Sequence, residues 1–287
     1  CLPDGWMATH PYCFNGAITR TVLDSAVMMN YMAYHDPRDP LSLDRGKRDF
    51  TELMKKPIKG LKIAFTADFD IFTVDPEVAG IVEAAAHRLE EAGAIVEQVH
   101  FGFKHSQNDF ANLWCRSICI DTAIDMELWK KEGFDLVRDH RDELPEEFIY
   151  WNEEALRSSI MDYRYFNELR TEILDEQENI FEKYDIIISP VTICPPVKNA
   201  SDGNTKGPEM MNGQRIEPLI GFCETFFENF AGNPAASVPA GLTATGLPVG
   251  MQIMGKKFLD EDVFAAAHAF EEISPWNYDI PYGREIH

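Results

Sequence analysis

The residues of this sequence that could act as nucleophiles are few and scattered. Cys1 stands at the first position, where the free α-amino group, with its nearly neutral pKa, could serve as base to an N-terminal thiol nucleophile. Ser158 and Ser159 form the only adjacent pair of serines, in a helix-like run without a glycine beside them. We therefore expect no catalytic residue in this chain and keep Cys1 as an alternative nucleophile.

The cysteines and histidines show no ligand spacing. Among the six cysteines there is no C-x-x-C pair, and the eight histidines lack the spacing of a zinc site. Cys115 and Cys119 lie one helical turn apart, which two half-buried thiols explain better than a ligand pair. No phosphate-binding loop is present. We expect no metal, no cofactor and a reducing, cytoplasmic compartment.

Composition narrows the class of partner. The 287 residues carry a net charge of −22, and a field of that sign repels nucleic-acid phosphates. No stretch approaches the roughly 18 to 20 apolar residues of a membrane helix. We expect neither nucleic acid nor membrane as a partner. The start at Cys1 lacks an initiator methionine and a signal segment, which predicts cleavage, a split gene or a start within a longer protein.

The pattern of elements predicts an α/β fold. Asp75-Pro76 is a helix start between two strand-like runs, which gives a βαβ unit over residues 61–99. A helix capped by Asp260 is expected to close the chain, and a long loop is expected over residues 190–221. The remaining expected elements are a helix at 21–34, a helical stretch at 106–183, and strands at 186–189, 235–239 and 248–254.

Three segments carry a more specific pattern. Residues 16–24 read Gly-Ala-Ile-Thr-Arg-Thr-Val-Leu-Asp, and residues 184–191 read Tyr-Asp-Ile-Ile-Ile-Ser-Pro-Val. Residues 229–241 read Asn-Phe-Ala-Gly-Asn-Pro-Ala-Ala-Ser-Val-Pro-Ala-Gly, and residues 246–255 read Gly-Leu-Pro-Val-Gly-Met-Gln-Ile-Met-Gly. The glycines and prolines of the last segment set the backbone geometry of two neighbouring strands.

In this order, the three segments resemble the amidase signature family; Ala17 departs from it, since proline is usual there. The resemblance implies a mixed β-sheet with helices on both faces. Residues 1–287 would be the C-terminal part of a single domain of that fold, with a helical insertion at about 106–183. It also implies hydrolysis of an amide by a serine nucleophile, which a second serine links to a lysine base.

That catalytic apparatus normally precedes the segment equivalent to residues 16–24. The chain has no Gly-Gly dipeptide, so the family's Gly-Gly-Ser loop is absent from it. We therefore expect an N-terminal amidase chain or segment, carrying the lysine and serines, to complete the sheet and supply the Ser-Ser-Lys triad. A sheet cut in half leaves edge N–H and C=O groups unpaired, so this association should be obligate. A dimer of the two-chain unit stays open.

This half is expected to contribute to the substrate pocket, because long loops near strand ends often shape specificity. The candidate pocket residues are Phe14, Asn15, Ile193, Cys194, Thr225, Phe226 and Asn229. Phe14 and Phe226 favour an apolar or aromatic acyl group. The leading hypothesis is an amidase of small-molecule carboxamides. The alternatives are a non-hydrolytic subunit, of amidotransferase or structural type, and a hydrolase that uses Cys1.

Overall fold

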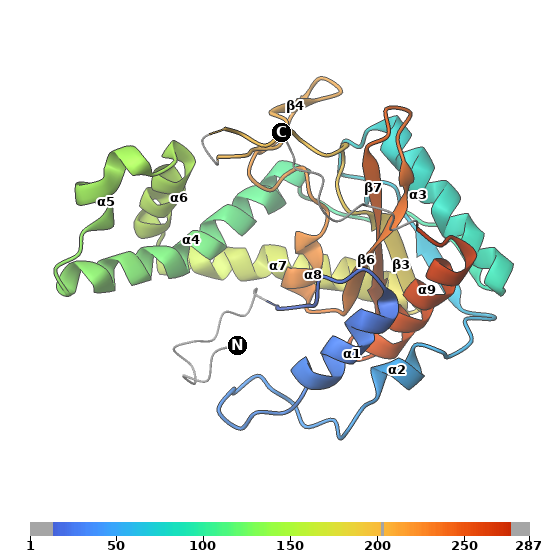
Figure 1. Cartoon of the computed structure of the whole chain (residues 1–287). Helices are drawn as coiled ribbons and strands as arrows, with labels where there is room; N and C mark the ends of the chain where they lie inside the picture. The colour runs from blue at the N-terminus through green and yellow to red at the C-terminus, as the bar shows by residue number, and fades with distance from the viewer. Residues whose placement is uncertain (1–13, 202–203, 277–287) are drawn as a thin grey trace.

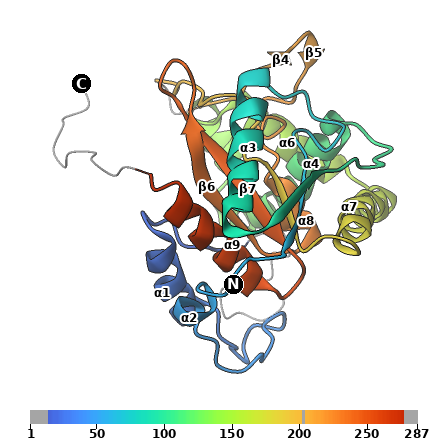
Figure 2. The same cartoon turned by 90° about the vertical axis from the view of Figure 1, so that its right-hand side faces the viewer.

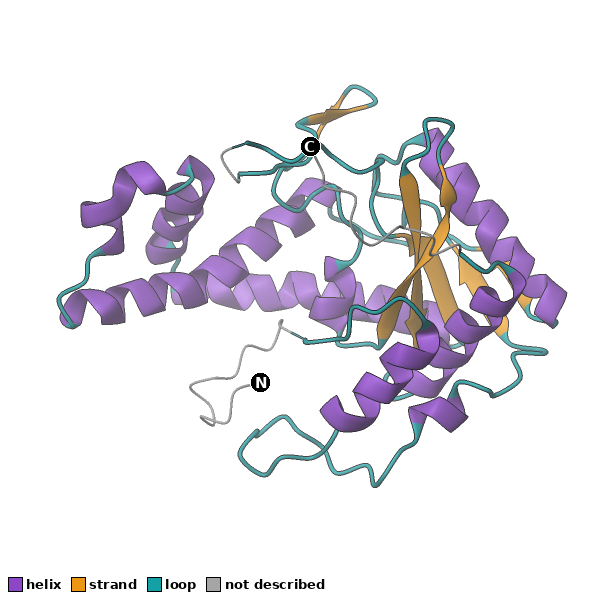
Figure 3. Ribbon diagram, viewed as in Figure 1, coloured by secondary structure: helices purple, strands orange, loops and turns teal. Residues whose placement is uncertain are grey.

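The computed structural model describes residues 14–201 and 204–276, which form a β-sheet between two layers of helices (Figures 1 and 3). The strands are β1 (Lys62–Phe65), β2 (Ile95–Gln98), β3 (Ile186–Pro190), β6 (Ala235–Leu242) and β7 (Pro248–Gly255), with a separate hairpin of β4 (Met210–Met211) and β5 (Gln214–Arg215). The α-helices are α1 (Val22–Met32), α2 (Phe50–Leu53), α3 (Pro76–Arg88), α4 (Gln107–Lys131), α5 (Leu136–His140), α6 (Glu146–Arg157), α7 (Ile160–Phe181), α8 (Phe226–Ala231) and α9 (Asp260–Ile273). Two 3₁₀ turns are η2 (Leu89–Ala92) and η3 (Arg141–Glu143).

The main sheet has the strand order β2-β1-β3-β7-β6. Strands β2, β1 and β3 run parallel, whereas β7 is antiparallel to both β3 and β6, so the sheet is mixed. The unit β1–α3–β2 confirms the predicted βαβ arrangement. Its helix begins as expected, because the Asp75 side chain accepts a hydrogen bond from the amide of Glu77 and Pro76 occupies the first turn.

Both faces of the sheet are covered by helices. The central strand β3 is fully buried, as expected for a parallel strand between two layers. Ile186 and Ile188 pack in the core that α1, α2, α3 and α9 cover, whereas Ile187 packs in the core beneath α4, α7 and α8. Figure 2 shows α3 and α9 lying across the near face of the sheet. This arrangement confirms the predicted fold class.

Helices α4 to α7 form an arm that reaches away from the sheet (Figure 1). The stretch 106–183 is helical as predicted, but the prediction that Ser158 and Ser159 lie inside a helix is wrong. Ser158 ends α6, and Ser159 caps α7 in a reciprocal capping box with Asp162. The two hydroxyl side chains satisfy backbone groups at helix ends, which explains the pair without catalysis.

Two further expectations need correction. Residue Leu259, not Asp260, is the N-cap of α9, and it makes no side-chain capping bond. The long loop over 190–221 contains the hairpin β4–β5, whose turn is Asn212-Gly213 with φ of 47° and 82°. An Asn-Gly pair suits such a turn because both residues tolerate positive φ.

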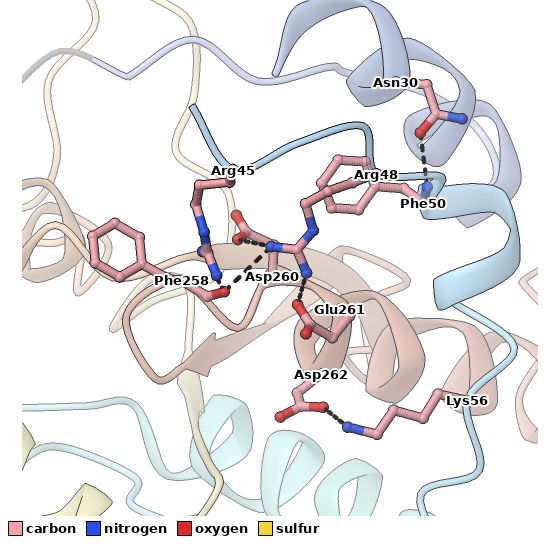
Figure 4. Close-up of polar contacts among 9 residues, drawn as sticks. All are labelled: Asn30, Arg45, Arg48, Phe50, Lys56, Phe258, Asp260, Glu261 and Asp262. Atoms are coloured by element: carbon pink, nitrogen blue, oxygen red, sulfur yellow. Dashed lines mark hydrogen bonds and ion pairs between the residues drawn. The ribbon is translucent and has the colours of Figure 1, made fainter. Parts of the chain in front are cut away.

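The chain between α1 and β1 is fastened to the first turn of α9 (Figure 4). Arg48 forms ion pairs with Asp260 and Glu261, and Lys56 Nζ lies 2.6 Å from Asp262 Oδ1. Three carboxylates in the first helical turn also suit the positive end of the helix dipole. The helix layer on this face therefore holds residues far apart in the sequence.

One edge of the sheet is open. Strand β6 has eight residues and, within the described chain, pairs only with β7. On the face shared with α8, Ala235, Ser237 and Pro239 of β6 are exposed. Helix α1 also exposes apolar side chains, namely Leu23, Val27, Met28 and Tyr31. None of the described helices is long and apolar enough to cross a membrane.

Candidate functional site

The site lies where the carboxyl ends of the parallel strands β1 and β3 meet, the usual place for ligands in α/β sheets. The chain that leaves β3 pairs antiparallel with the chain that leads into α8. Ile193 N donates to Phe222 O at 2.9 Å, and Glu224 N donates to Val191 O at 3.1 Å. This pairing joins segments about 30 residues apart in the sequence.

The pairing brings most of the predicted pocket residues together. Ile193 and Cys194 lie on the segment after β3, and Thr225 and Phe226 lie where α8 begins. Asn229 is one turn further along α8. Ile193, Cys194 and Phe226 are buried in the core, whereas Thr225 and Asn229 are partly exposed. Thr225 and Asn229 are therefore the members of this group with surface available to a ligand.

The two remaining pocket candidates lie elsewhere. Phe14 and Asn15 are exposed on the segment that leads into α1, which belongs to the opposite helical layer. Phe14 exposes 63% of its surface, so it fills no apolar pocket within the described chain. Their place in a pocket stays a prediction, as does that of the five residues near β3 and α8.

A row of polar side chains, which the sequence motifs did not group, crosses the sheet beside these residues. Gln252 of β7 stands between Ser189 of β3 and Ser237 of β6 in the strand register, so the three share one face. Ser189 and Gln252 are buried, whereas Ser237 is exposed at the open edge. We call Ser189, Gln252 and Ser237 the polar row. Two of its members lie on strands whose sequences gave no polar periodicity, so only register could group them.

Glu224 lies at the buried end of the polar row and has no exposed surface. Neither of its carboxyl oxygens has a hydrogen-bond partner that meets normal geometry within the described chain. Burial raises the pKa of Glu224 well above its ordinary value, the neighbouring Ser189 hydroxyl opposes the rise, and the charge of Asp68 adds to it. Glu224 is therefore a neutral carboxyl at pH 7. A charged residue among Phe222, Cys223 and Phe226 was the sequence signal for it.

The turn that presents Asp68 is held in an unusual backbone conformation. Phe69 and Asp70 have φ of 50° and 60°, a region that residues other than glycine rarely adopt. The buried hydroxyl of Thr66 accepts a hydrogen bond of 2.8 Å from Phe69 N, and Asp70 accepts one of 2.6 Å from Phe101 N. Such strain is often found beside functional sites.

The site as described does not contain a hydroxyl ready to attack a substrate. Ser189 is buried, and its hydroxyl donates to the carbonyl of Pro190 at 3.0 Å. Cys1 lies outside the described residues. Burial raises the pKa of Cys223 to about 12, so that thiol is not a thiolate at neutral pH. Among the described residues, no group of three or more His, Cys, Asp or Glu side chains could hold a metal ion.

A family model described as Amidase matches residues 10–264. The chain belongs to the amidase family. The structure is also similar to that of a bacterial aryl acylamidase of the amidase signature family, with a TM-score of 0.91 and 42% identity over 94% of this chain and 55% of that one. This likeness confirms the resemblance on which the fold was predicted.

Two kinds of amidase relative are found among curated proteins. An acylamidase of Rhodococcus erythropolis is 30% identical over 269 residues, which are 92% of this chain and 53% of the relative. A glutamyl-tRNA(Gln) amidotransferase subunit of Geobacillus stearothermophilus is 34% identical over 289 residues, 93% of this chain and 56% of the relative. The chain thus spans about half the length of the curated relatives it matches.

Proposed function

We propose that this chain is the C-terminal part of an amidase that hydrolyses a small-molecule carboxamide to a carboxylate and an amine, with aryl acylamides as the first class to test. The likeness that carries the proposal is the 42% identity to an aryl acylamidase over nearly the whole chain. In the reaction, a serine oxygen attacks the amide carbonyl, the amine leaves with a proton, and water then releases the acyl group.

In this proposal the triad of Ser, Ser and Lys is provided by polypeptide outside residues 1–287, either a second chain or a further segment of the same one. The open edge of β6 supports it, because an eight-residue edge strand offers N–H and C=O groups to another strand. The apolar side chains exposed on α1, including Leu23 and Tyr31, support it too, since neighbouring polypeptide would bury them. Residues 1–287 would then belong to one domain, with the helical insertion at 106–183.

The substrate would bind over the exposed end of the polar row, near Ser237. Thr225 and Asn229 would line that space from α8, and the buried Ile193, Cys194 and Phe226 would support the lining from behind. Phe14 and Asn15 would approach from the α1 side once the sheet is completed. A cytoplasmic location would suit the free thiols of this chain.

A second candidate is a subunit of amidotransferase type, because several relatives are subunits of glutamyl-tRNA(Gln) amidotransferases. The net charge of −22 speaks against direct contact with tRNA. The remaining alternatives are a hydrolase that uses Cys1 and a degenerate structural subunit.

The test uses the native protein that contains this chain, purified from its source. Release of 4-nitroaniline from 4-nitroacetanilide reports an amidase, whereas release of ammonia from glutamine reports an amidotransferase-type site. Intact mass and a denaturing gel identify the polypeptides of the active species. Activity in a species that contains only residues 1–287 would refute the placement of the triad outside this chain and would make Cys1 the first residue to replace.

A further inference from the structure

Glu224 is the buried acidic side chain that the proposed reaction does not use. It lies at the point where the segment after β3 pairs with the segment before α8, with its backbone N–H bonded to Val191 O at 3.1 Å. Its side chain is wholly buried beside Ser189, although both oxygens lack a partner of normal geometry in the described chain. A carboxyl is costly to bury, so its presence here calls for a role that offsets the cost.

The neighbours of Glu224 connect it to the open face of the sheet. Ser189 faces Gln252 in the register of β3 and β7, and Gln252 faces Ser237 in the register of β7 and β6. The Gln252 amide is held from the other side, since Nε2 donates to Met254 Sδ at 3.1 Å. A continuous row of polar groups therefore runs from Glu224 to the surface over which the substrate is proposed to bind.

The same place allows little movement. A Cβ on Gly250 would lie 2.9 Å from Val191 Cγ2 and 3.4 Å from Ser237 Oγ, so the segment after β3 rests directly on β7. Val191 N also donates to Gly250 O at 3.1 Å. A change at Glu224 would consequently be felt at Val191 and at the exposed end of the polar row.

We propose that Glu224 is a positioning residue, which through Ser189 fixes both the polar row and the segment of residues 191–194 that border the substrate site. The inference rests on the proposed amidase function. As a neutral carboxyl, Glu224 donates its proton to the Ser189 oxygen, while the Ser189 hydroxyl donates to Pro190 O at 3.0 Å. Ionisation would remove that donor and place a negative charge near Asp68.

Two substitutions separate positioning from simple bulk. Glu224→Gln keeps a neutral donor of the same shape, so kcat/KM should stay within about threefold of the parent value, since one hydrogen bond exchanges for another. Glu224→Leu keeps the volume but has no donor, and kcat/KM for 4-nitroacetanilide should fall about tenfold. Glu209→Gln, at an exposed glutamate of the loop before α8, is the control and should change nothing.

The pH profile provides a readout that a structural role alone would not move. The groups facing Glu224 are Ser189 of β3, Asp68 after β1 and the neighbouring thiols of Cys223 and Cys194. Because the folded pKa of Glu224 is raised, the working neutral form exists at low pH and is lost as pH rises through that pKa. The parent protein should therefore lose kcat/KM at alkaline pH relative to Glu224→Gln.

Hydrogen exchange decides the inference without any activity. Amides of residues 189–194 should exchange faster in Glu224→Leu than in the parent, and at the parental rate in Glu224→Gln and Glu209→Gln. Equal exchange in all four proteins would overturn the positioning role, as would parental kcat/KM in Glu224→Leu. If the parent hydrolyses no amide, the proposed function fails, and the exchange rates still judge the role of Glu224. If Glu224→Leu does not fold, the alkaline profile and exchange of Glu224→Gln decide alone.

Discussion

Glu228 of α8 should make the stability of this protein strongly dependent on pH. Its side chain is buried, and Gln177 Nε2 of α7 donates to Glu228 Oε1 at 2.5 Å. Asn233 Nδ2 in turn donates to Gln177 Oε1 at 2.8 Å. Burial raises the pKa of Glu228 to about 8, and the amide donors of Gln177 and Asn233 oppose that rise only in part.

The size of the effect follows from the difference between the two states. At pH below the ordinary value of 4.5, Glu228 is protonated both in the folded and in the unfolded protein. As pH rises from there toward 8, only the unfolded state ionises freely, so the free energy of unfolding falls by about 1.4 kcal/mol per pH unit. Glu228→Gln does not titrate. Between pH 4.5 and 7 it should therefore gain about 3 kcal/mol relative to the parent.

Urea unfolding followed by tryptophan fluorescence at pH 4.5, 7 and 8.5 measures this gain. Glu178→Gln, at an exposed position of α7, is the matched control and should run parallel to the parent at every pH. The glutamine at 228 can still accept from Gln177, so packing and hydrogen bonding are kept. A constant difference between Glu228→Gln and the parent across this range would refute the reasoning, because it would mean that Glu228 ionises in the folded protein as it does in water.

Two further predictions concern the layer beneath α8. Phe227 is fully buried against five aromatic rings, so Phe227→Ala should lower the free energy of unfolding by about 3 to 5 kcal/mol, measured by the urea midpoint, and a loss below about 1 kcal/mol would contradict this packing. Because burial raises the pKa of Cys223 to about 12, its thiol should stay unmodified by iodoacetamide at pH 8 in the native protein and react once unfolded, as peptide mass spectrometry would show. Rapid native labelling of Cys223 would mean that the pairing of its segment opens readily.

The fold was largely predictable because its signals are local. Asp75-Pro76 marks the start of α3, and the apolar run at residues 186–188 marks a central strand. The break at Ser158 and Ser159 was missed although Ser159 and Asp162 form a capping-box pattern, because the helical periodicity continues across it. Short-range chemistry was present in both cases, and only its weight against periodicity was misjudged.

The site was less predictable because tertiary pairing creates it. Nothing local to Ile193 or Thr225 says that residues 191–194 pair with residues 222–224. Glu224 in an apolar run was visible as an anomaly, but its neighbour Ser189 lies 35 positions earlier in the chain. Register, which depends on how whole strands align, is what places Ser189 opposite Gln252.

The two buried glutamates flank one short helix, and this placement has a physical consequence. Helix α8 has six residues, too few to be stable without tertiary contacts. Glu224 precedes its first turn and Glu228 lies within it, so both ends of its position depend on side chains that must stay neutral. Such carboxyls lower stability compared with apolar residues, yet they allow few alternative positions, because any shift would expose or unpair them. The residues with free surface on α8, Thr225 and Asn229, are therefore held in place at the expense of stability, as expected of a helix that forms part of a binding site.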